Sequence, residues 1–394
     1  MTKPSTAAII GGGVAGPVTA MALRQAGIEA TVFEAYAHGA EGVGSFLTVA
    51  VNGQRALREL DLLDLVRKHG FDCPRFEFVS GKGKPLGGFP AAPTGPDGLT
   101  SRTVRRTDLY EALRDEALRR GVTVEYGKRL VDAERGGDGV TAVFADGTRF
   151  TADILVGADG LLSRTRELID PAAPKPRYVP LLNTGGFTRA AVPGEPGTMV
   201  MYFGRDAFFC HMLAPDGVVW WFANIPQVRE LSPAELAAIT PQQWRRRLID
   251  TFAVDATPAR AVVEATEQIA LPWNTYDFPS VPTWHDDRMV LVGDAAHAAA
   301  PTSGQGASLA IEDALVLAKA LRDAPDAATA FSAYERERRG RVERIVAEAK
   351  KLSSDKMPGP VGRLIRDAVL PLVFAKRAKS GGDDWVLSHE IHWA

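Results

Sequence analysis

Three glycines near the start of the sequence have the spacing of a dinucleotide-binding turn. Gly11, Gly13 and Gly16 form the frame G-x-G-x-x-G, in which the first glycine makes the turn and the second lets the backbone approach a pyrophosphate. Glu34 stands where a carboxylate can accept hydrogen bonds from both ribose hydroxyls. FAD and NAD both fit this pattern, whereas the acid disfavours a ribose 2′-phosphate.

The elements that must hold these residues can be read from the flanking sequence. Residues 7–10 form a short apolar run, residues 18–26 have a helical pattern that ends at Gly27, and residues 30–33 are rich in β-formers. This order predicts a β-turn-α-β unit, with the glycines at the turn and free N–H groups at the start of the helix.

Two further acids follow apolar runs that read as buried strands. The run 152–156 ends on Gly157-Ala158-Asp159-Gly160, and the run 288–292 ends on Gly293-Asp294. Ligands of open α/β sheets bind beyond the carboxyl ends of the strands. We therefore expect these two ends and the glycine turn to converge on one extended ligand.

A different texture begins near residue 179, where apolar and aromatic β runs dominate up to residue 269. Turn signals separate these runs, which indicates a mostly antiparallel second domain. His211 is our first candidate for a substrate base or hydrogen-bond acceptor, and His297 reads more simply as a packed or capping histidine. Substrate contacts are predicted on strands expected to face a cavity, at Phe187, Phe203, Phe209, His211, Trp221 and Asn224.

Composition places the chain among ordinary globular proteins. It has 394 residues, of which 45% are hydrophobic and 24% charged, and its net charge is −2. The charge gives no sign of a nucleic-acid partner, and no run is long enough for a membrane span. Without a signal peptide and with only Cys73 and Cys210, we expect a cytoplasmic protein that binds no metal.

Four motifs together resemble the single-component FAD-dependent aromatic hydroxylases of the para-hydroxybenzoate hydroxylase type. They are GGGVAG, RRTDLYEAL, GADGLLSRTR and GDAAHAAAPTSGQGASLAIEDA, and the resemblance covers nearly the whole chain. The chain is similar to the compact, tetracycline-monooxygenase-like subgroup, because it lacks a thioredoxin-like extension.

The resemblance implies the cofactor contacts. Asp294 would bond the ribityl chain of non-covalent FAD, Arg106 (or its neighbour Arg105) would contact the pyrophosphate or ribityl region, and a helix beginning at 304–306 would face the flavin pyrimidine edge. Asp159 would lie close to the pyrophosphate and support use of NADPH or NADH. The implied FAD site comprises Gly11, Gly13, Val14, Ala15, Gly16, Glu34, Ala35, Arg105, Arg106, Leu130, Asp159, Gly293, Asp294, Pro301, Gly304, Gln305 and Gly306.

The predicted fold class is α/β, with a Rossmann-type FAD-binding domain, an inserted, mostly antiparallel β-sheet substrate domain and C-terminal helices. We assign residues 1–72, 100–178 and 280–326 to the FAD-binding domain and residues 73–99 and 179–279 to the substrate domain. Residues 327–394 form a helical region. Its charged run, residues 335–339, reads as a solvated helix face.

The predicted function is an NAD(P)H-dependent FAD monooxygenase that uses O₂ and a C4a-hydroperoxyflavin to hydroxylate an aromatic or polycyclic small molecule. The protein would act as a monomer or homodimer. Two alternatives are an FAD oxidoreductase that inserts no oxygen and a non-enzymatic protein that has kept the FAD fold.

Overall fold

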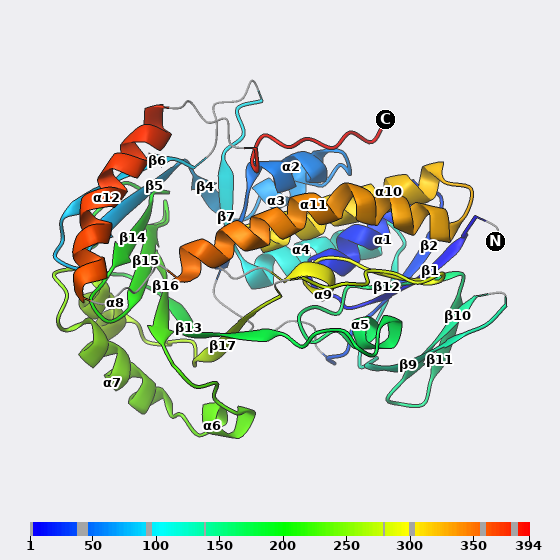
Figure 1. Ribbon diagram of the computed structural model, residues 1–394, viewed down its shortest axis with the longest axis horizontal. Coiled ribbons are helices and arrows are strands. Elements are labelled where there is room, and N and C mark those ends of the chain that lie inside the picture. Colours follow the sequence, from blue (N-terminus) through cyan, green and yellow to red (C-terminus); the bar gives the residue numbers. More distant parts are fainter. Residues whose placement is uncertain are drawn as a thin grey trace.

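Two large sheets divide the molecule (Figure 1). The computed structural model describes residues 3–37, 46–91, 97–137, 139–278, 280–298, 304–354, 360–379 and 385–394. A five-stranded sheet lies at the right of Figure 1 and a seven-stranded sheet at the left, and two three-stranded sheets complete the described β-structure.

The five-stranded sheet is parallel throughout and contains the predicted β-turn-α-β unit. Its strands are buried apolar runs, because helices such as α1 (Ala15–Gln25), α4 (Arg106–Arg119) and α10 (Gly306–Asp323) cover it. In spatial order the strands are β18 (Met289–Leu291), β12 (Ile154–Gly157), β1 (Thr6–Ile10), β2 (Glu29–Phe33) and β8 (Thr123–Glu125).

The seven-stranded sheet is antiparallel except where β5 and β14 run parallel. Helices α7 (Pro241–Phe252) and α8 (Ala259–Ala265) pack on one of its faces, after the short α6 (Pro233–Ala237). In spatial order the strands are β17 (Trp273–Asp277), β13 (Arg177–Thr188), β16 (Val219–Pro226), β15 (Phe208–Leu213), β14 (Met199–Phe203), β5 (Arg75–Ser80) and β6 (Pro85–Pro90).

A small sheet joins these two halves. Its strands are β3 (Phe46–Val49), β7 (Ser101–Arg105) and β4 (Phe71–Cys73), and β7 leads directly into α4. The remaining elements are α2 (Val51–Arg58), α3 (Leu63–Arg67), β9 (Leu130–Arg135), β10 (Val140–Phe144), β11 (Arg149–Ala152), α5 (Arg164–Ile169) and α9 (Asp294–His297).

Helix α11 (Ala327–Ser354) packs along α10 and corrects one expectation. The charged run 335–339 is not a uniformly solvated face, because Arg338 is fully buried. Helical periodicity places Arg338 in line with the buried Tyr334 and Val342, whereas Arg336 is exposed.

Residues 385–394 are tied to several helices. Arg341 of α11 donates to the carbonyl oxygens of Trp385 and Val386, and Lys319 of α10 donates to that of His392. The backbone N–H of Trp393 donates to Glu59, which follows α2. This segment therefore links three helices of the five-stranded half.

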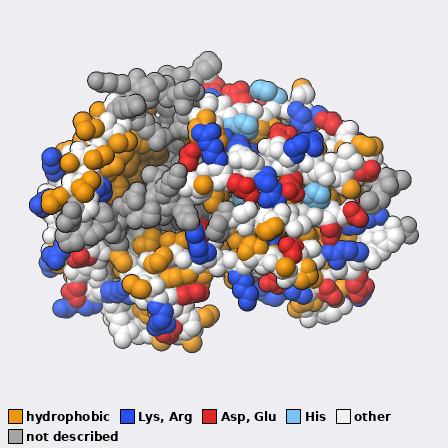
Figure 2. Space-filling view, viewed as in Figure 1, with side chains coloured by type: hydrophobic (Ala, Val, Ile, Leu, Met, Phe, Trp, Pro, Cys, Tyr) orange, Lys and Arg blue, Asp and Glu red, His pale blue; other side chains and the backbone are white. Residues whose placement is uncertain are grey.

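Helix α12 (Pro360–Lys379) packs on β6 and shows hydrophobic side chains at the surface (upper left in Figure 2). Phe374 is buried against Phe78 and Phe89, while Leu364 and Leu372 are exposed. Within the described residues, no helix is both long and apolar enough to cross a membrane.

Candidate functional site

The three strand ends singled out in the sequence lie side by side. β1, β12 and β18 are adjacent and parallel, so the glycine turn, residues 157–160 and Gly293-Asp294 leave the same edge of the sheet. A Cβ added at Gly11 would lie 2.3 Å from the carbonyl oxygen of Ala158, and the φ of Gly11 is +111°. The predicted convergence is confirmed, and only glycine fits this turn.

The opposite side of the turn is open. A Cβ added at Gly13 would meet no atom within 4 Å. Helix α1 begins at Ala15, after Val14, without a side-chain cap, so its first N–H groups have no side-chain acceptor at the cap. Backbone that is open at this point suits an approaching phosphate.

Glu34 follows β2 and shapes the same turn. Its Oε2 accepts a hydrogen bond from the N–H of Gly12 at 2.7 Å, and its Oε1 accepts one from the N–H of Tyr36 at 2.9 Å. The acid and Ala35 therefore lie beside the glycines, where the sequence predicted them. Leu130, the first residue of β9, is buried in the neighbouring core.

Asp159 is bound within its own turn. Its Oδ1 accepts from the hydroxyl of Ser163 at 2.5 Å, and its Oδ2 accepts from the N–H and hydroxyl of Thr165. Desolvation raises the pKa of Asp159, although these hydrogen bonds oppose the rise. Asp159 thus holds the turn that packs against Gly11.

Asp294 lies in a different environment. Its side chain is exposed, yet desolvation by the surrounding protein raises its pKa, which His297 and Arg106 partly oppose. A carboxyl with both properties faces an opening inside the fold. A Cβ added at Gly306 would meet only Oδ1 of Asp294, 3.8 Å away.

Arg106 completes this opening. One of its terminal nitrogens donates to the hydroxyl of Tyr110 at 2.9 Å, but its Nε is buried and has no partner in the part of the chain that the structure describes. A buried donor without an acceptor is costly, so a ligand that brings an acceptor atom to this nitrogen would bind favourably. The residues present therefore fit FAD.

Gln305 and Gly306 begin α10, which has no side-chain cap, and a Cβ added at Gly304 would meet nothing. Pro301 lies outside the described residues.

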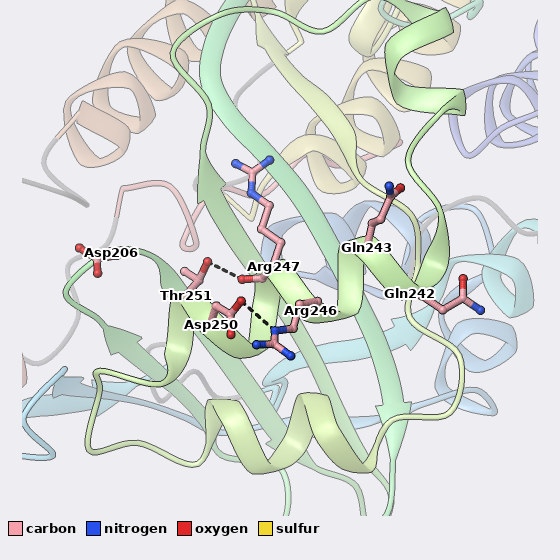
Figure 3. A pocket seen from close by; sticks show the side chains of 7 residues that line it. All are labelled: Asp206, Gln242, Gln243, Arg246, Arg247, Asp250 and Thr251. Atoms are coloured by element: carbon pink, nitrogen blue, oxygen red, sulfur yellow. Dashed lines mark hydrogen bonds and ion pairs between the residues drawn. The ribbon is translucent and has the colours of Figure 1, made fainter.

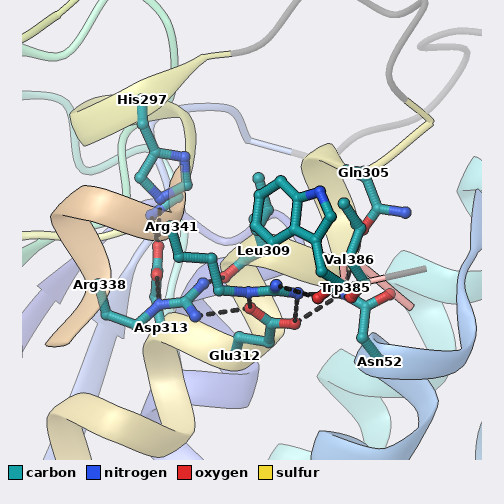
Figure 4. Close-up of polar contacts among 11 residues, drawn as sticks. Asn52, His297, Gln305, Leu309, Glu312, Asp313, Arg338, Arg341, Trp385 and Val386 are labelled. Carbon is teal, nitrogen blue, oxygen red and sulfur yellow. Dashed lines mark hydrogen bonds and ion pairs between the residues drawn. The ribbon is translucent and has the colours of Figure 1, made fainter. Parts of the chain in front are cut away.

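A buried polar network joins α10 and α11 (Figure 4), and it reaches the backbone of Gly293 through Asp313. Asp313 of α10 accepts from the N–H of Gly293 at 2.9 Å and from Nε of Arg338 at 2.7 Å, and Nε2 of His297 lies 2.5 Å from its Oδ2. Desolvation would raise the pKa of Asp313, but His297 and Arg338 together hold it below its usual value. His297 also packs on Trp284, as a structural histidine would.

The network continues through Glu312 to the start of α10. Glu312 accepts from Asn52 at 2.6 Å and from Arg341 at 3.0 Å, and it lies 2.6 Å from a terminal nitrogen of Arg338. Asn52 also donates to the side chain of Gln305 at 3.1 Å. Sequence reasoning missed this network, although the spacing of Glu312 and Asp313 within the last motif was visible.

The seven-stranded sheet presents one face to α7 and α8 and the other, which we call the inner face, to the β3–β7–β4 sheet. Phe46 of β3 contacts Trp220 and Phe222 of β16, with ring centroids 5.7 and 5.8 Å apart. The inner face keeps accessible surface, since its aromatic and sulfur side chains are only partly buried at Phe46, Phe76, Phe187, Met201, Phe203 and Phe222.

Three of the predicted substrate residues lie on the inner face. Phe187 and Phe203 pack in its apolar cluster. Asn224 alternates with Phe222 along β16 and donates to the side chain of Asn183, its cross-strand neighbour, at 2.7 Å. The sequence did not predict roles for Phe46, Phe208, Trp220, Phe222 or Asn183.

The predictions for Phe209, His211 and Trp221 are wrong, because these side chains point to the helix-covered face. Phe209 packs on Phe252 of α7, and the indole N–H of Trp221 donates to Thr266. Nε2 of His211 lies 2.9 Å from the carbonyl oxygen of Pro193, and burial lowers the pKa of His211 to about 4. His211 is therefore a neutral core residue near pH 7.

Replacing His211 with alanine should accordingly reduce stability and leave catalysis unaltered. The loss of a buried hydrogen bond and of packing is expected to cost ~1–3 kcal/mol of the free energy of unfolding. Thermal unfolding should show a lower midpoint, while the ratio of product formed to NAD(P)H consumed stays at the wild-type value. A lower ratio of product to NAD(P)H consumed, with an unchanged midpoint of thermal unfolding, would show that His211 acts in the active site.

A groove of about 810 Å³ lies elsewhere, along α7 (Figure 3). Its lining includes Arg246, which is ion-paired with Asp250 at 3.0 Å one helical turn away, and Arg247. None of the residues singled out in the sequence lines it, so it is not the candidate site. No group of three metal-ligating side chains occurs among the described residues.

Comparison with known proteins gives concordant matches. A family model described as "FAD binding domain" matches residues 5–349. The FAD-dependent urate hydroxylase of Klebsiella pneumoniae is 31% identical over 356 residues, covering 88% of each chain. The salicylate hydroxylase of Pseudomonas putida is 30% identical over 367 residues, covering 86% of this chain and 82% of that one.

The structure of Klebsiella pneumoniae HpxO with FAD and uric acid superposes with a TM-score of 0.83 at 26% identity, covering 97% of both chains.

Proposed function

This chain belongs to the FAD binding domain family, and from that premise we infer that it is an FAD-dependent monooxygenase, which uses NAD(P)H and O₂ to hydroxylate an aromatic or polycyclic small molecule. We propose that the Asp294 opening holds FAD and that the inner face of the seven-stranded sheet holds the substrate.

One observation carries this division of labour. Arg105 and Arg106 are adjacent, at the junction of β7 and α4, yet they serve different halves. Arg106 acts electrostatically on Asp294, whereas the guanidinium of Arg105 lies 4.4 Å from the ring centroid of Phe187 on the inner face. Two consecutive residues therefore connect the Asp294 opening with the inner face.

The chemistry follows from this juxtaposition. When bound, FAD would supply oxygen activation after its reduction by NAD(P)H. Glu34, Arg106 and Asp294 would hold the cofactor, and free N–H groups at the start of α10 favour negative charge beside it. The rings of the inner face would orient the substrate and keep water away from the reacting atoms.

Isotope labelling tests this proposal. With the FAD-loaded enzyme, NAD(P)H and ¹⁸O₂, we expect one ¹⁸O atom in the hydroxylated product for each NAD(P)H consumed, apart from reducing equivalents lost as hydrogen peroxide. Phenolic and polycyclic compounds that accelerate NAD(P)H oxidation identify substrates. A product formed without label would instead establish an oxidoreductase that inserts no oxygen.

We further propose a monomer or homodimer that works in the cytoplasm. Both cysteines, Cys73 and Cys210, are free and buried, as in proteins of reducing compartments. Light scattering during gel filtration measures the mass of the particle.

A further inference from the structure

The inner face is uncharged across its centre. On β14, β15 and β16 the side chains that point to it are aromatic, thiol, thioether or amide groups, from Met199 on β14 to Asn224 on β16. Glu77 of the adjoining β5 lies on the other side, where its charge acts on Tyr202. The inner face therefore has no acidic group of its own on these central strands.

Arg105 brings a positive charge to this face. Because Arg105 pairs with Phe46 in the β3–β7 ladder, the two side chains share one side of that sheet, and both contact Trp220. The guanidinium lies 4.4 Å from the ring centroid of Phe187 and 5.4 Å from that of Trp220. It is thus held flanking two rings of the inner face.

Among the residues that the structure describes, no carboxylate forms an ion pair with Arg105, and no acceptor takes a hydrogen bond from its guanidinium. Arg366 offers a contrast, since it lies over Phe203 but is ion-paired with Asp367 at 2.8 Å. A partly exposed guanidinium that is held by two aromatic rings, and whose donors have no acceptor in the described part of the chain, is a preorganised site for a planar anion.

We propose that Arg105 binds an anionic group, a carboxylate or phenolate oxygen, on the aromatic substrate. This inference rests on the proposed function and makes Arg105 a specificity-determining residue. The substrate ring would pack among the rings of the inner face while its anionic group pairs with the guanidinium. A phosphate group of NAD(P)H is a second anionic ligand that Arg105 can bind. The experiment must therefore separate the substrate from the reductant.

The test compares acids with their neutral amides. Salicylate and salicylamide, and 1-hydroxy-2-naphthoate and its amide, are titrated into FAD-loaded enzyme, and dissociation constants are taken from tryptophan fluorescence. We expect the wild type to bind each acid at least about tenfold more tightly than its amide, the ratio typical of a charge-assisted hydrogen bond. Arg105→Gln should abolish this preference, and Arg105→Lys should keep part of it.

The matched control is Arg189→Gln, two residues beyond Phe187 on the chain. Arg189 is exposed and donates to the carbonyl oxygen of Asp216, so its loss removes the same charge without touching the inner face. The preference for acids should persist in this variant. FAD content and the midpoint of thermal unfolding, measured for every variant, show that each protein is folded and loaded.

Several results would overturn the inference. If the wild type binds acids and amides equally, or if Arg105→Gln loses the same affinity for both, Arg105 contributes only to the shape of the substrate site. A raised half-saturating NADPH concentration in Arg105→Gln, with the acid preference intact, would assign Arg105 to the reductant. Labelled oxygen in the product of a neutral aromatic would then leave the proposed function standing, whereas its absence from every product would refute that function.

Discussion

Replacing Asp294 with alanine is expected to yield folded protein that purifies almost without FAD. The carboxylate lies at the opening between Arg106, Gly306 and His297, where a cofactor hydroxyl would be its partner. A charge-assisted hydrogen bond of this kind contributes ~1.5–3 kcal/mol. Its loss corresponds to a dissociation constant for FAD that is roughly 10- to 150-fold higher. The absorbance of flavin released from denatured protein measures the bound fraction, and titration of the apoprotein with FAD gives the constant.

Asp287→Ala is the matched control for this prediction. Asp287 precedes the same strand, β18, but its side chain is exposed at the surface. Its removal should leave FAD content at the wild-type value. If Asp294→Ala also retains full FAD affinity, the cofactor lies elsewhere and the proposed site is wrong.

The second large effect is expected from Arg338→Met, which should destabilise the whole fold. Arg338 is fully buried and balances two buried carboxylates, those of Glu312 and Asp313. Removing one partner of a buried ion network leaves uncompensated charge and typically costs ~3–5 kcal/mol. Because a native domain is stable by only ~5–15 kcal/mol, denaturant unfolding should show a much lower midpoint.

Arg336→Met on the same helix provides the control. Arg336 is exposed, so its substitution should change the free energy of unfolding by less than ~0.5 kcal/mol. Comparable losses in the two variants would mean that the network contributes nothing specific.

The destabilisation should also depend on pH. In the wild type the pKa values of Glu312 and Asp313 lie below their ordinary values of 4.5 and 3.8, so their contribution to stability is present above about pH 4.5 and declines in acid. Without Arg338, desolvation is opposed only by Asn52 and Arg341 at Glu312 and by His297 and the N–H of Gly293 at Asp313. We therefore expect both pKa values to rise, so that ionisation favours folding less. The difference in unfolding free energy between wild type and variant should therefore be larger at pH 8 than at pH 5.

Sequence reasoning succeeded where local spacing determines structure. The glycine frame, the helix after it and Glu34 lie within one short β-turn-α-β unit, so their relation depends on few long-range contacts. The convergence of Asp159 and Asp294 on that unit followed from a general rule for parallel sheets, and the adjacency of β1, β12 and β18 bears it out.

The same reasoning failed for the orientation of strand residues. A strand with one buried face alternates between apolar and polar residues, but the seven-stranded sheet is covered on both faces. The run from Val219 to Phe222 is apolar at every position, so nothing in it tells Trp220 from Trp221. Trp220 faces inward, and Trp221 faces α7 and α8. The same ambiguity on β15 explains why Phe209 and His211 were predicted on the wrong face.

The prediction that charge gave for α11 was wrong for a related reason. A run of five charged residues normally lies in water, but helical periodicity turns one of every three or four side chains toward the core. Arg338 is stable in that position because it forms ion pairs with Glu312 and Asp313 of α10. Spacing along the sequence does not reveal a contact between such distant segments.

The polar network has a consequence for biosynthesis. Asp313, Arg338 and Arg341 stand far along the chain from β1, and the sheet edge beside β12 stays unpaired until β18 has been translated. The seven-stranded sheet, by contrast, has all its strands before residue 278. During synthesis the nascent chain can thus assemble the aromatic sheet first, while the FAD cradle waits for α10, α11 and the segment bound by Arg341. We therefore expect flavin to be incorporated as a late step, after the inner face of the seven-stranded sheet has formed.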